Sequence, residues 1–482
     1  MIPIDLNMGN QQNENPERIT TILLVGLAAI FLGQAIQSGN GAITKSGLVF
    51  LALAIVFSAL SIYSSRFKLL RVSGKVVWFV LLMGLVLQIS EMIAISPVIY
   101  GTPEALNTRW QFQVLVVFAG TCALISISPE KWVAQVIRKI AIVLVFICMF
   151  LAGVWVIKAS PKPFIDTFYV HQSSALALQQ NKNPYELSEP NIYGDLRFYG
   201  EKWVKNGRMT VGNGYPPMSI YLTSVGFLIF GDTRYGILLA LLISGAFIRS
   251  FTKNRFSNLA AFLLLFSPRA FFILEQAWTE PFLIMLLAIL VWVCIYHPKW
   301  RFVLLGLLMA SKQYLVVMFP IAFLLLNKDY RPREWIKPIT TTIGTALIVT
   351  LPLALRNFQK FIWDVGLSQF YQPFRYDTLS FLSAYAFVSG KTPSQYFSIV
   401  TLVLAELYVL LRANYSPSGF SLGIAFSILM FFAFSKQGSP NYYFMVIGAL
   451  ATALSVLPLE RIDTEPYWPR RTLQAKEFQK NE

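Results

Sequence analysis

Long apolar stretches recur along this chain, and they constrain its fold more than any other feature of the sequence. Clear examples are residues 47–63, 76–95, 139–157 and 279–296. A bilayer core about 30 Å thick needs roughly 20 apolar residues per helical crossing, so stretches of this kind can span a membrane as α-helices. Only 13% of the 482 residues are charged, which is too few to cover a water-soluble globule of this length. We therefore expect an all-α polytopic membrane protein.

Basic residues gather in the short links between apolar stretches and give a prediction of topology. The positive-inside rule assigns cation-dense links to the cytoplasm, and these are residues 66–75, 249–255, 328–337 and the basic tail 459–482. Counting outward from them gives about fourteen crossings, with a range of about 11 to 14, and places both termini in the cytoplasm. The links expected on the outer side are 96–110, 158–216, 273–278, 356–394 and 436–440.

Two apolar stretches do not fit simple crossings. If residues 218–230 crossed the membrane, the cationic link 249–255 would face outward, so we expect a juxtamembrane helix over 217–230 in the outer interface. Residues 309–320 are expected to form two short helices that meet at the outer surface near Lys312. That arrangement places the ammonium group at a helix end rather than in lipid.

The chain is expected to have four parts and one long outer loop. A cytoplasmic tail, 1–18, precedes crossings in 19–138 to which we assign no role. The core spans 139–458 and carries the outer loop 158–216, and the basic tail follows. The polar N-terminus lacks the pattern of a signal peptide or an organelle-targeting segment. We therefore expect a retained first helix and residence in a prokaryotic inner membrane.

Several functional classes find no support in the sequence. The net charge of +16 lies in links rather than on one helix face, so membrane lipids are the expected partners and nucleic acid is not. The segment Gly41 to Ser46 has the wrong glycine spacing for a phosphate-binding loop, and neither a D-x-D pair nor a dinucleotide-binding glycine pattern is present. The three cysteines lie in apolar stretches and predict no disulfide framework.

Asp166 is the candidate catalytic residue of the outer loop. It lies near the expected membrane surface beside Phe164, Phe168 and Tyr169, where partial desolvation would suit a general base acting on a hydroxyl group. The alternative is that Asp166 caps a helix that starts near Thr167. His171, five residues on, would point away from Asp166 on a helix, so no metal pair is expected.

Aromatic and proline residues mark the rest of this loop. The aromatic side chains either stack on a sugar or form an interfacial belt, and they are Tyr185, Tyr193, Tyr199, Trp203 and Tyr215. Pro216 and Pro217 fix a rigid start for the next helix.

Cations also occur on the side where the positive-inside rule expects few of them. They suit a phosphate or pyrophosphate whose lipid tail stays in the bilayer, or they snorkel to headgroups, and they are Lys312, Arg356, Lys360, Arg375 and Lys436. Glu275 and Glu280 either bind a substrate hydroxyl or cap a helix. Glu91 and Glu406, inside expected helices, would be the anchors of a different function, a transporter or flippase of a lipid-linked or anionic solute.

The order of these features resembles a known superfamily. After Asp166 come NPY at 183–185, YPPMSIYL at 215–222, FGDTR at 230–234, WTEP at 278–281 and LMASKQYLVVMFP at 308–320. This resembles the glycosyltransferase C superfamily, and most closely its polyprenyl-phosphate-mannose-dependent bacterial mannosyltransferases. The resemblance covers about residues 140–458, whereas members usually have one helix before their loop and this chain has about four crossings there.

The resemblance implies an inverting hexosyltransferase that uses a polyprenyl-phosphate sugar and a glycolipid or glycan acceptor on the outer face. Asp166 would be the base, Tyr215, Pro216 and Pro217 would close the loop, and Lys312 would contact the phosphate. The substrate-binding set is completed by Tyr185, Glu280, Arg356, Arg375 and Lys436. No metal ligand is assigned. Some members have a second acidic residue beside the catalytic one and this chain has none, which leaves a divalent cation open as a cofactor.

Overall fold

The computed structural model describes residues 16–63, 72–194, 196, 198–252, 254–326 and 332–459. Regular structure in these residues is helical except for one hairpin of β1 (Val204–Lys205) and β2 (Arg208–Met209). The expectation of an all-α protein is confirmed. The basic tail from residue 460 and most of the N-terminal tail lie outside the described residues, as does most of the link 66–75.

Six of the described helices are long and apolar enough to cross a membrane: α1 (Pro16–Gln37), α2 (Lys45–Tyr63), α3 (Gly74–Ala94), α5 (Arg109–Ile127), α6 (Gln135–Ala159) and α15 (Ile336–Ala354). The bent pair α8 (Pro217–Phe230) and α9 (Arg234–Ser250) would make a seventh. The chain is therefore a multi-pass membrane protein by the length and composition of its helices. The predicted count of fourteen is not supported, because other apolar stretches form helices of 17 residues or fewer. At about 1.5 Å per residue, such a helix is shorter than the bilayer core.

The remaining elements are shorter. The other α-helices are α4 (Pro103–Asn107), α7 (Asp166–Gln179), α10 (Arg255–Leu265), α11 (Ala270–Glu275), α12 (Glu280–Tyr296), α13 (Arg301–Met309), α14 (Gln313–Val317), α16 (Phe358–Phe361), α17 (Ser368–Tyr371), α18 (Phe381–Ser389), α19 (Tyr396–Arg412), α20 (Pro417–Ala433) and α21 (Pro440–Val456). The 3₁₀-helices are η3 (Pro184–Glu186), η4 (Pro298–Trp300), η5 (Phe319–Leu325) and η6 (Pro332–Trp335). η7 (Ile362–Leu367) is a π-helix.

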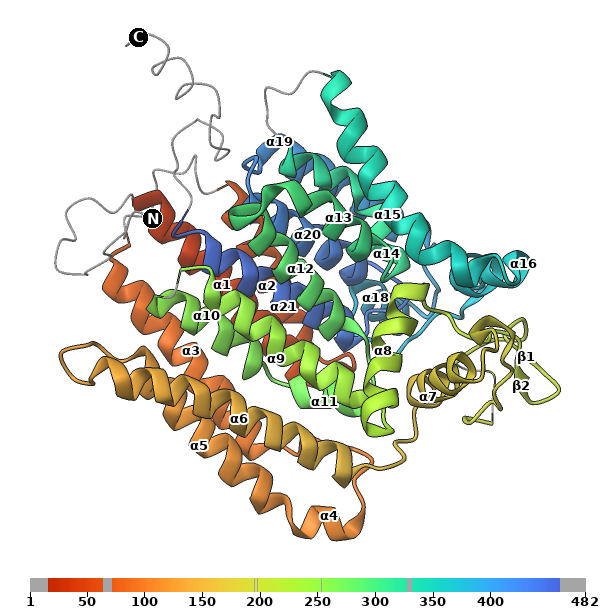
Figure 1. Cartoon of the computed structure of the whole chain (residues 1–482), viewed down its shortest axis with the longest axis horizontal. Helices are drawn as coiled ribbons and strands as arrows, with labels where there is room; N and C mark the ends of the chain where they lie inside the picture. Colours follow the sequence, from red (N-terminus) through yellow and green to blue (C-terminus); the bar gives the residue numbers. More distant parts are fainter. Residues whose placement is uncertain are drawn as a thin grey trace, which may run out of the picture.

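The centre of the bundle is formed by helices that bury nearly all of their side chains. α20 and α21 pack together, and α21 also contacts α10 and α12. α1 packs against α21 and α2 against α20, so the N-terminal helices belong to the same body as the core. The hairpin of α5 and α6 covers one flank (Figure 1).

Links that the sequence assigns to one side of the membrane lie together along one edge of the bundle. Figure 1 shows α4, α11, α7, the β1–β2 hairpin and α16 along its lower and right-hand edge. The Ile99 amide donates to the Glu275 carboxylate at 2.8 Å, and the Arg375 amide donates to the Lys436 carbonyl at 3.0 Å. The Glu275 carboxylate therefore connects the links 273–278 and 96–110 by hydrogen bonds and is not a free carboxylate.

The two stretches that did not fit simple crossings are both interrupted in the structure. α8 and α9 meet at 111° around Gly231, whose φ of 76° is left-handed, so residues 217–230 form a separate helix. The buried Arg234 holds this bend, because it pairs with Asp232 at 2.6 Å and donates to the Ser160 carbonyl at 2.7 Å. α13 and α14 are likewise separated by an extended residue, Lys312.

Gly226 lets the two arms of the α8–α9 bend approach closely. A Cβ atom at Gly226 would lie 2.4 Å from the Gly236 backbone nitrogen, whereas a Cβ atom at Gly344 in α15 would meet nothing within 4 Å. We therefore expect Gly226→Ala to destabilise the protein by about 1–3 kcal/mol through overpacking. Thermal unfolding in detergent measures the change.

Gly344→Ala is the matched control. It is expected to leave the stability unchanged or to raise it by up to about 1 kcal/mol, because alanine is the better helix former. Equal effects of the two substitutions would contradict the close approach of α8 and α9.

Candidate functional site

A cavity of about 340 Å³ lies between the long loop and the helical core. More than half of its lining residues lie in 189–215. The rest come from the start of α7, Lys312 and the start of α14, α17 and the residue after it, and α21. The charged and aromatic residues that line it include Asp166, Glu189, Tyr199, Trp203, Tyr215, Lys312 and Tyr442. The candidate base and the candidate phosphate contact thus share one cavity.

Asp166 is the first residue of α7, and its two oxygens have different partners. Oδ1 accepts a hydrogen bond from the Thr167 amide at 2.7 Å, and Oδ2 accepts one from the Tyr199 hydroxyl at 2.8 Å. Burial raises the pKa of Asp166, while the Tyr199 hydrogen bond opposes that rise. The N-cap residue of α7 is Ile165, and this helix has no side-chain cap hydrogen bond, so the capping interpretation of Asp166 is not confirmed. Oδ1 meets the amide of the next residue, and Oδ2 is held by a cavity-lining tyrosine.

The loop that carries Tyr199 is shaped by a tight hairpin. Asn206 and Gly207 have φ angles of 53° and 72°, the left-handed values that favour Asn-Gly at the centre of a two-residue hairpin turn. The turn brings Trp203 beside Met209 and Val211 in one apolar cluster. The rings of Tyr199 and Trp203 stack within this cluster at a centroid distance of 6.0 Å. The hairpin therefore builds an aromatic wall of the cavity.

Lys312, the second charged residue that the sequence singled out, also lines the cavity and is held in a buried ion pair. Its Nζ donates to Glu280 Oε1 at 2.7 Å and to Thr279 Oγ1 at 3.2 Å. Asn441 donates to the same Glu280 oxygen at 2.8 Å. The ammonium group also lies 4.5 Å from the centre of the Tyr215 ring. Lys312 is thus held by the start of α12 and by the Tyr215 ring, and it does not snorkel to a surface.

A left-handed residue joins the two charged parts of the site. Ala277 has a φ of 54°, which is unusual for a residue with a Cβ atom. The preceding carbonyl, of Gln276, accepts a hydrogen bond from the Thr167 hydroxyl at 2.6 Å. The turn therefore connects the start of α7, where Asp166 lies, to the start of α12, where Glu280 lies.

The other predicted substrate-binding residues of the loop have structural partners. The fully buried Tyr185 donates from its hydroxyl to the Tyr215 carbonyl at 2.9 Å. Pro216 and Pro217 begin α8 directly after Tyr215. His171 is also buried, with its ring centre 4.8 Å from that of Tyr215, and burial lowers its pKa to about 3. These residues surround Tyr215 without lining the cavity.

Three predicted cations lie beyond the cavity lining. Arg356 donates to Asn181 Oδ1 at 2.9 Å, and Arg375 forms a bidentate pair with Asp377 at 2.8 and 2.7 Å. Lys436 donates to backbone carbonyls at the end of α17 and just after it, those of Gln369, Phe370 and Gln372. Arg356 and Lys436 thus connect segments far apart in the chain, whereas Arg375 pairs within its own segment.

Sequence reasoning missed the amide side chains of the site. Gln313, Gln369 and Gln372 line the cavity, as does Tyr442. No local pattern marks them, because tertiary contacts alone bring α14, α17 and α21 together. Within the described residues no group of three or more His, Cys, Asp or Glu side chains is placed to hold a metal ion.

Comparisons with protein-family models, with curated proteins and with solved structures find no match for this chain.

The buried pair of Lys312 and Glu280 gives a prediction for stability. Lys312→Met leaves Glu280 buried without its cation, which is expected to cost about 3–5 kcal/mol. Adding Glu280→Gln removes the unpaired charge, so the double variant should be more stable than Lys312→Met alone. Thermal unfolding of the two single variants and the double variant measures the coupling, and strictly additive effects would contradict a buried pair.

Proposed function

We propose that this protein is a membrane glycosyltransferase that moves a hexose, such as mannose, from a polyprenyl-phosphate donor to a hydroxyl group of a glycolipid or glycan. The observation that carries the proposal is the cavity of about 340 Å³ lined by both the Asp166 carboxylate and the Lys312 ammonium group. The resemblance of the sequence to the glycosyltransferase C superfamily, and to its mannosyltransferase branch, supports the same function. We place this cavity at the outer face of a prokaryotic inner membrane, with both termini in the cytoplasm.

Asp166 acts as the general base in the proposed reaction. Its carboxylate takes the proton of the acceptor hydroxyl as that oxygen attacks the anomeric carbon of the donor. The bond between the anomeric carbon and the phosphate oxygen breaks, and polyprenyl phosphate leaves with the electron pair. Direct displacement of this kind inverts the anomeric carbon. The hydrogen bonds from Tyr199 and Thr167 hold the carboxylate in place before the substrates bind.

Lys312 stabilises the leaving phosphate. A lysine ammonium group has three N–H donors, and Glu280 and Thr279 accept two of them. The third is free to meet a phosphate oxygen in the cavity that Lys312 lines. A cation held in this way needs no rearrangement as negative charge develops on the leaving group.

The rest of the cavity suits a neutral sugar. Tyr199 and Trp203 offer apolar ring faces, and the amide groups of Gln313, Gln369 and Gln372 can donate to and accept from hydroxyl groups. Cavities that combine an apolar wall with a few fixed polar groups are typical of small-molecule sites.

The lipid tail of the donor would lie on the exposed apolar face of α8. α8 begins two residues after the cavity residue Tyr215 and exposes a row of large apolar side chains, Val225, Leu228, Ile229 and Phe230. The carboxylates that would anchor a transporter do not line the cavity: Glu91 is bonded to Gln34 at 2.8 Å, and Glu406 lies in α19.

Asp166→Asn tests the base directly. Loss of the ionisable group should lower the rate of sugar transfer by about 10²- to 10⁴-fold, the usual contribution of a general base. Purified protein, a labelled polyprenyl-phosphate hexose and candidate envelope acceptors provide the assay.

Glu201→Gln is the matched control, because Glu201 is an exposed carboxylate of the same loop that does not line the cavity. Its rate of transfer should equal that of the unmodified protein. Activity of Asp166→Asn at the level of this control would remove Asp166 as the base.

Tyr199→Phe is expected to change the pH dependence of transfer. The Tyr199 hydroxyl stabilises the ionised form of Asp166, so its removal raises the pKa of Asp166 further. Because the base must be ionised, the acid limb of kcat/KM against pH should move to higher pH. The exposed Tyr396→Phe should leave the profile in place. If the acid limb does not move in Tyr199→Phe, ionisation of Asp166 does not control the rate of transfer.

A further inference from the structure

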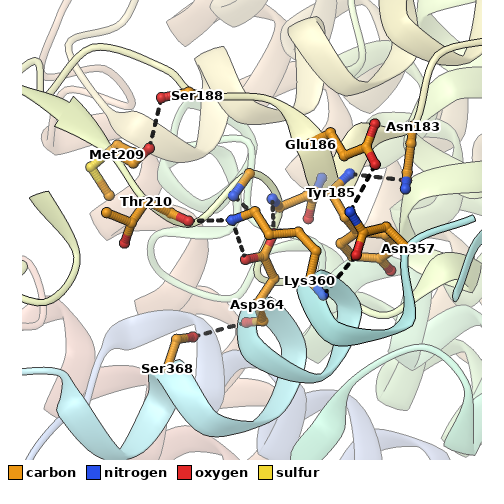
Figure 2. Close-up of polar contacts among 12 residues, drawn as sticks. Asn183, Tyr185, Glu186, Ser188, Met209, Thr210, Asn357, Lys360, Asp364 and Ser368 are labelled. Carbon is orange, nitrogen blue, oxygen red and sulfur yellow. Dashed lines mark hydrogen bonds and ion pairs between the residues drawn. The ribbon is translucent and has the colours of Figure 1, made fainter. Parts of the chain in front are cut away.

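The long loop is fastened to one short segment of the chain, which we call the arm: α16, η7 and α17, residues 358–371. Figure 2 shows residues of the loop and of the arm in one network of polar contacts. The Trp203 indole donates to the Ser368 carbonyl at 2.8 Å, and the Lys202 ammonium lies 3.7 Å from the centre of the Tyr371 ring. The arm therefore supports the part of the loop that covers the cavity.

Asp364 is the centre of this network. Its side chain is fully buried, and Oδ2 accepts hydrogen bonds from the backbone amides of Gly212 at 2.9 Å and Asn213 at 3.3 Å. Oδ1 accepts a hydrogen bond from the Lys360 ammonium at 2.9 Å, and Lys360 also donates to the Thr210 carbonyl. One carboxylate thus organises the backbone of the loop from residue 210 to residue 213.

A buried carboxylate is costly to keep unless its oxygens are satisfied. Burial raises the pKa of Asp364 to about 6, so at neutral pH the group is mostly ionised and is held by Lys360 and the loop amides. Asp364 does not line the cavity and has no part in the proposed transfer step. The Lys360 ammonium and the two loop amides offset the cost of burying this charge.

The backbone that Asp364 holds is a wall of the cavity. Val211, Gly212, Gly214 and Tyr215 all line it. Gly212 is wedged so closely that a Cβ atom there would lie 2.4 Å from the Tyr185 carbonyl oxygen. The wall at Gly212 is therefore held by close packing against the Tyr185 carbonyl and by the hydrogen bond to Asp364.

The next residues of the wall reach the charged site. The Gly214 carbonyl accepts a hydrogen bond from Gln313 Nε2 at 3.1 Å, and Gln313 follows Lys312 in the chain. The Tyr215 ring lies against the Lys312 ammonium group. A shift of the backbone at Gly212 and Asn213 would thus be transmitted to Gln313 and to the surroundings of Lys312.

We propose that Asp364 is a positioning residue, which holds the backbone of residues 210–214 in place as the wall of the cavity between Asp166 and Lys312. Its effect on sugar transfer rests on the proposed function. Its effect on the wall does not, and the two are measured separately.

Thiol labelling measures the wall without any substrate. Val211 is 5% exposed, and the native cysteines Cys122, Cys148 and Cys294 are buried in helices. In a Val211→Cys background, a water-soluble maleimide should react slowly at position 211. Adding Asp364→Ala removes the acceptor of both amides, so labelling at 211 should accelerate by about tenfold or more, the factor for about one lost hydrogen bond to a charged group. The native cysteines should stay unreactive.

Two further variants separate positioning from folding. Asp364→Asn keeps an oxygen that can accept from the loop amides but loses the ion pair, so its labelling rate should lie between those of the unmodified background and the Ala variant. Lys360→Met leaves both loop amides their acceptor but removes its cation, so its labelling rate should also exceed that of the unmodified background. Glu130→Gln removes a carboxylate from an exposed ion pair with Arg138 and should change nothing. If the native cysteines react in Asp364→Ala, that variant has unfolded and does not count. The single variants Asp364→Asn and Lys360→Met then test the proposal by their labelling rates at position 211.

Unchanged labelling at position 211 in the variants, with the native cysteines silent, would overturn the proposal. In the transfer assay, Asp364→Asn should raise KM by about tenfold with a smaller change in kcat, because the wall binds substrate while Asp166 remains in place. An equal loss in kcat alone would count against a positioning role. Faster labelling without transfer by any form of the protein would reject the glycosyltransferase and leave the role of Asp364 in the wall intact.

Discussion

Burial of charge in an apolar body is the constraint on which the rest of this structure depends. A charged group that leaves water must find partners that satisfy it, and the cost of failing to do so is several kcal/mol, about the whole stability of a folded domain. Three ion pairs supply such partners: Arg234 with Asp232, Lys312 with Glu280, and Lys360 with Asp364. Oε2 of Glu280 has no hydrogen-bond partner among the described residues. Arg234 also donates to the Ser160 carbonyl, and Lys360 and Asp364 together bond the backbone of residues 210–213.

The sequence predicted the helical architecture because apolar length and charge placement are local properties. The breaks at 217–230 and around Lys312 followed from charge, and both are present as separate helices. The number of crossings did not follow, since several apolar stretches fold as helices that are too short to span. A hydropathy pattern counts apolar residues and does not show where tertiary packing ends a helix.

The site was predictable only in part, for a related reason. Asp166 and Lys312 stood out because a charge in an apolar setting is visible in the sequence, and they do line one cavity. The Asn206–Gly207 pair is a sequence signal for a hairpin turn, and it was missed because only helices were expected. Nothing local distinguishes Gln369 from other polar residues, or the carbonyl-binding Lys436 from a phosphate-binding one. Their positions depend on contacts between segments far apart in the chain.

Photo-crosslinking with the proposed donor tests the central claim most directly. A polyprenyl-phosphate hexose with a photoreactive group on the sugar should label peptides that contain the start of α7, residues 199–215 and residues 312–313, and unlabelled donor should compete. The same experiment reports on both the substrate and the cavity, independently of the acceptor. Competed labelling confined to peptides that do not line the cavity, or labelling that unlabelled donor does not reduce, would contradict the account.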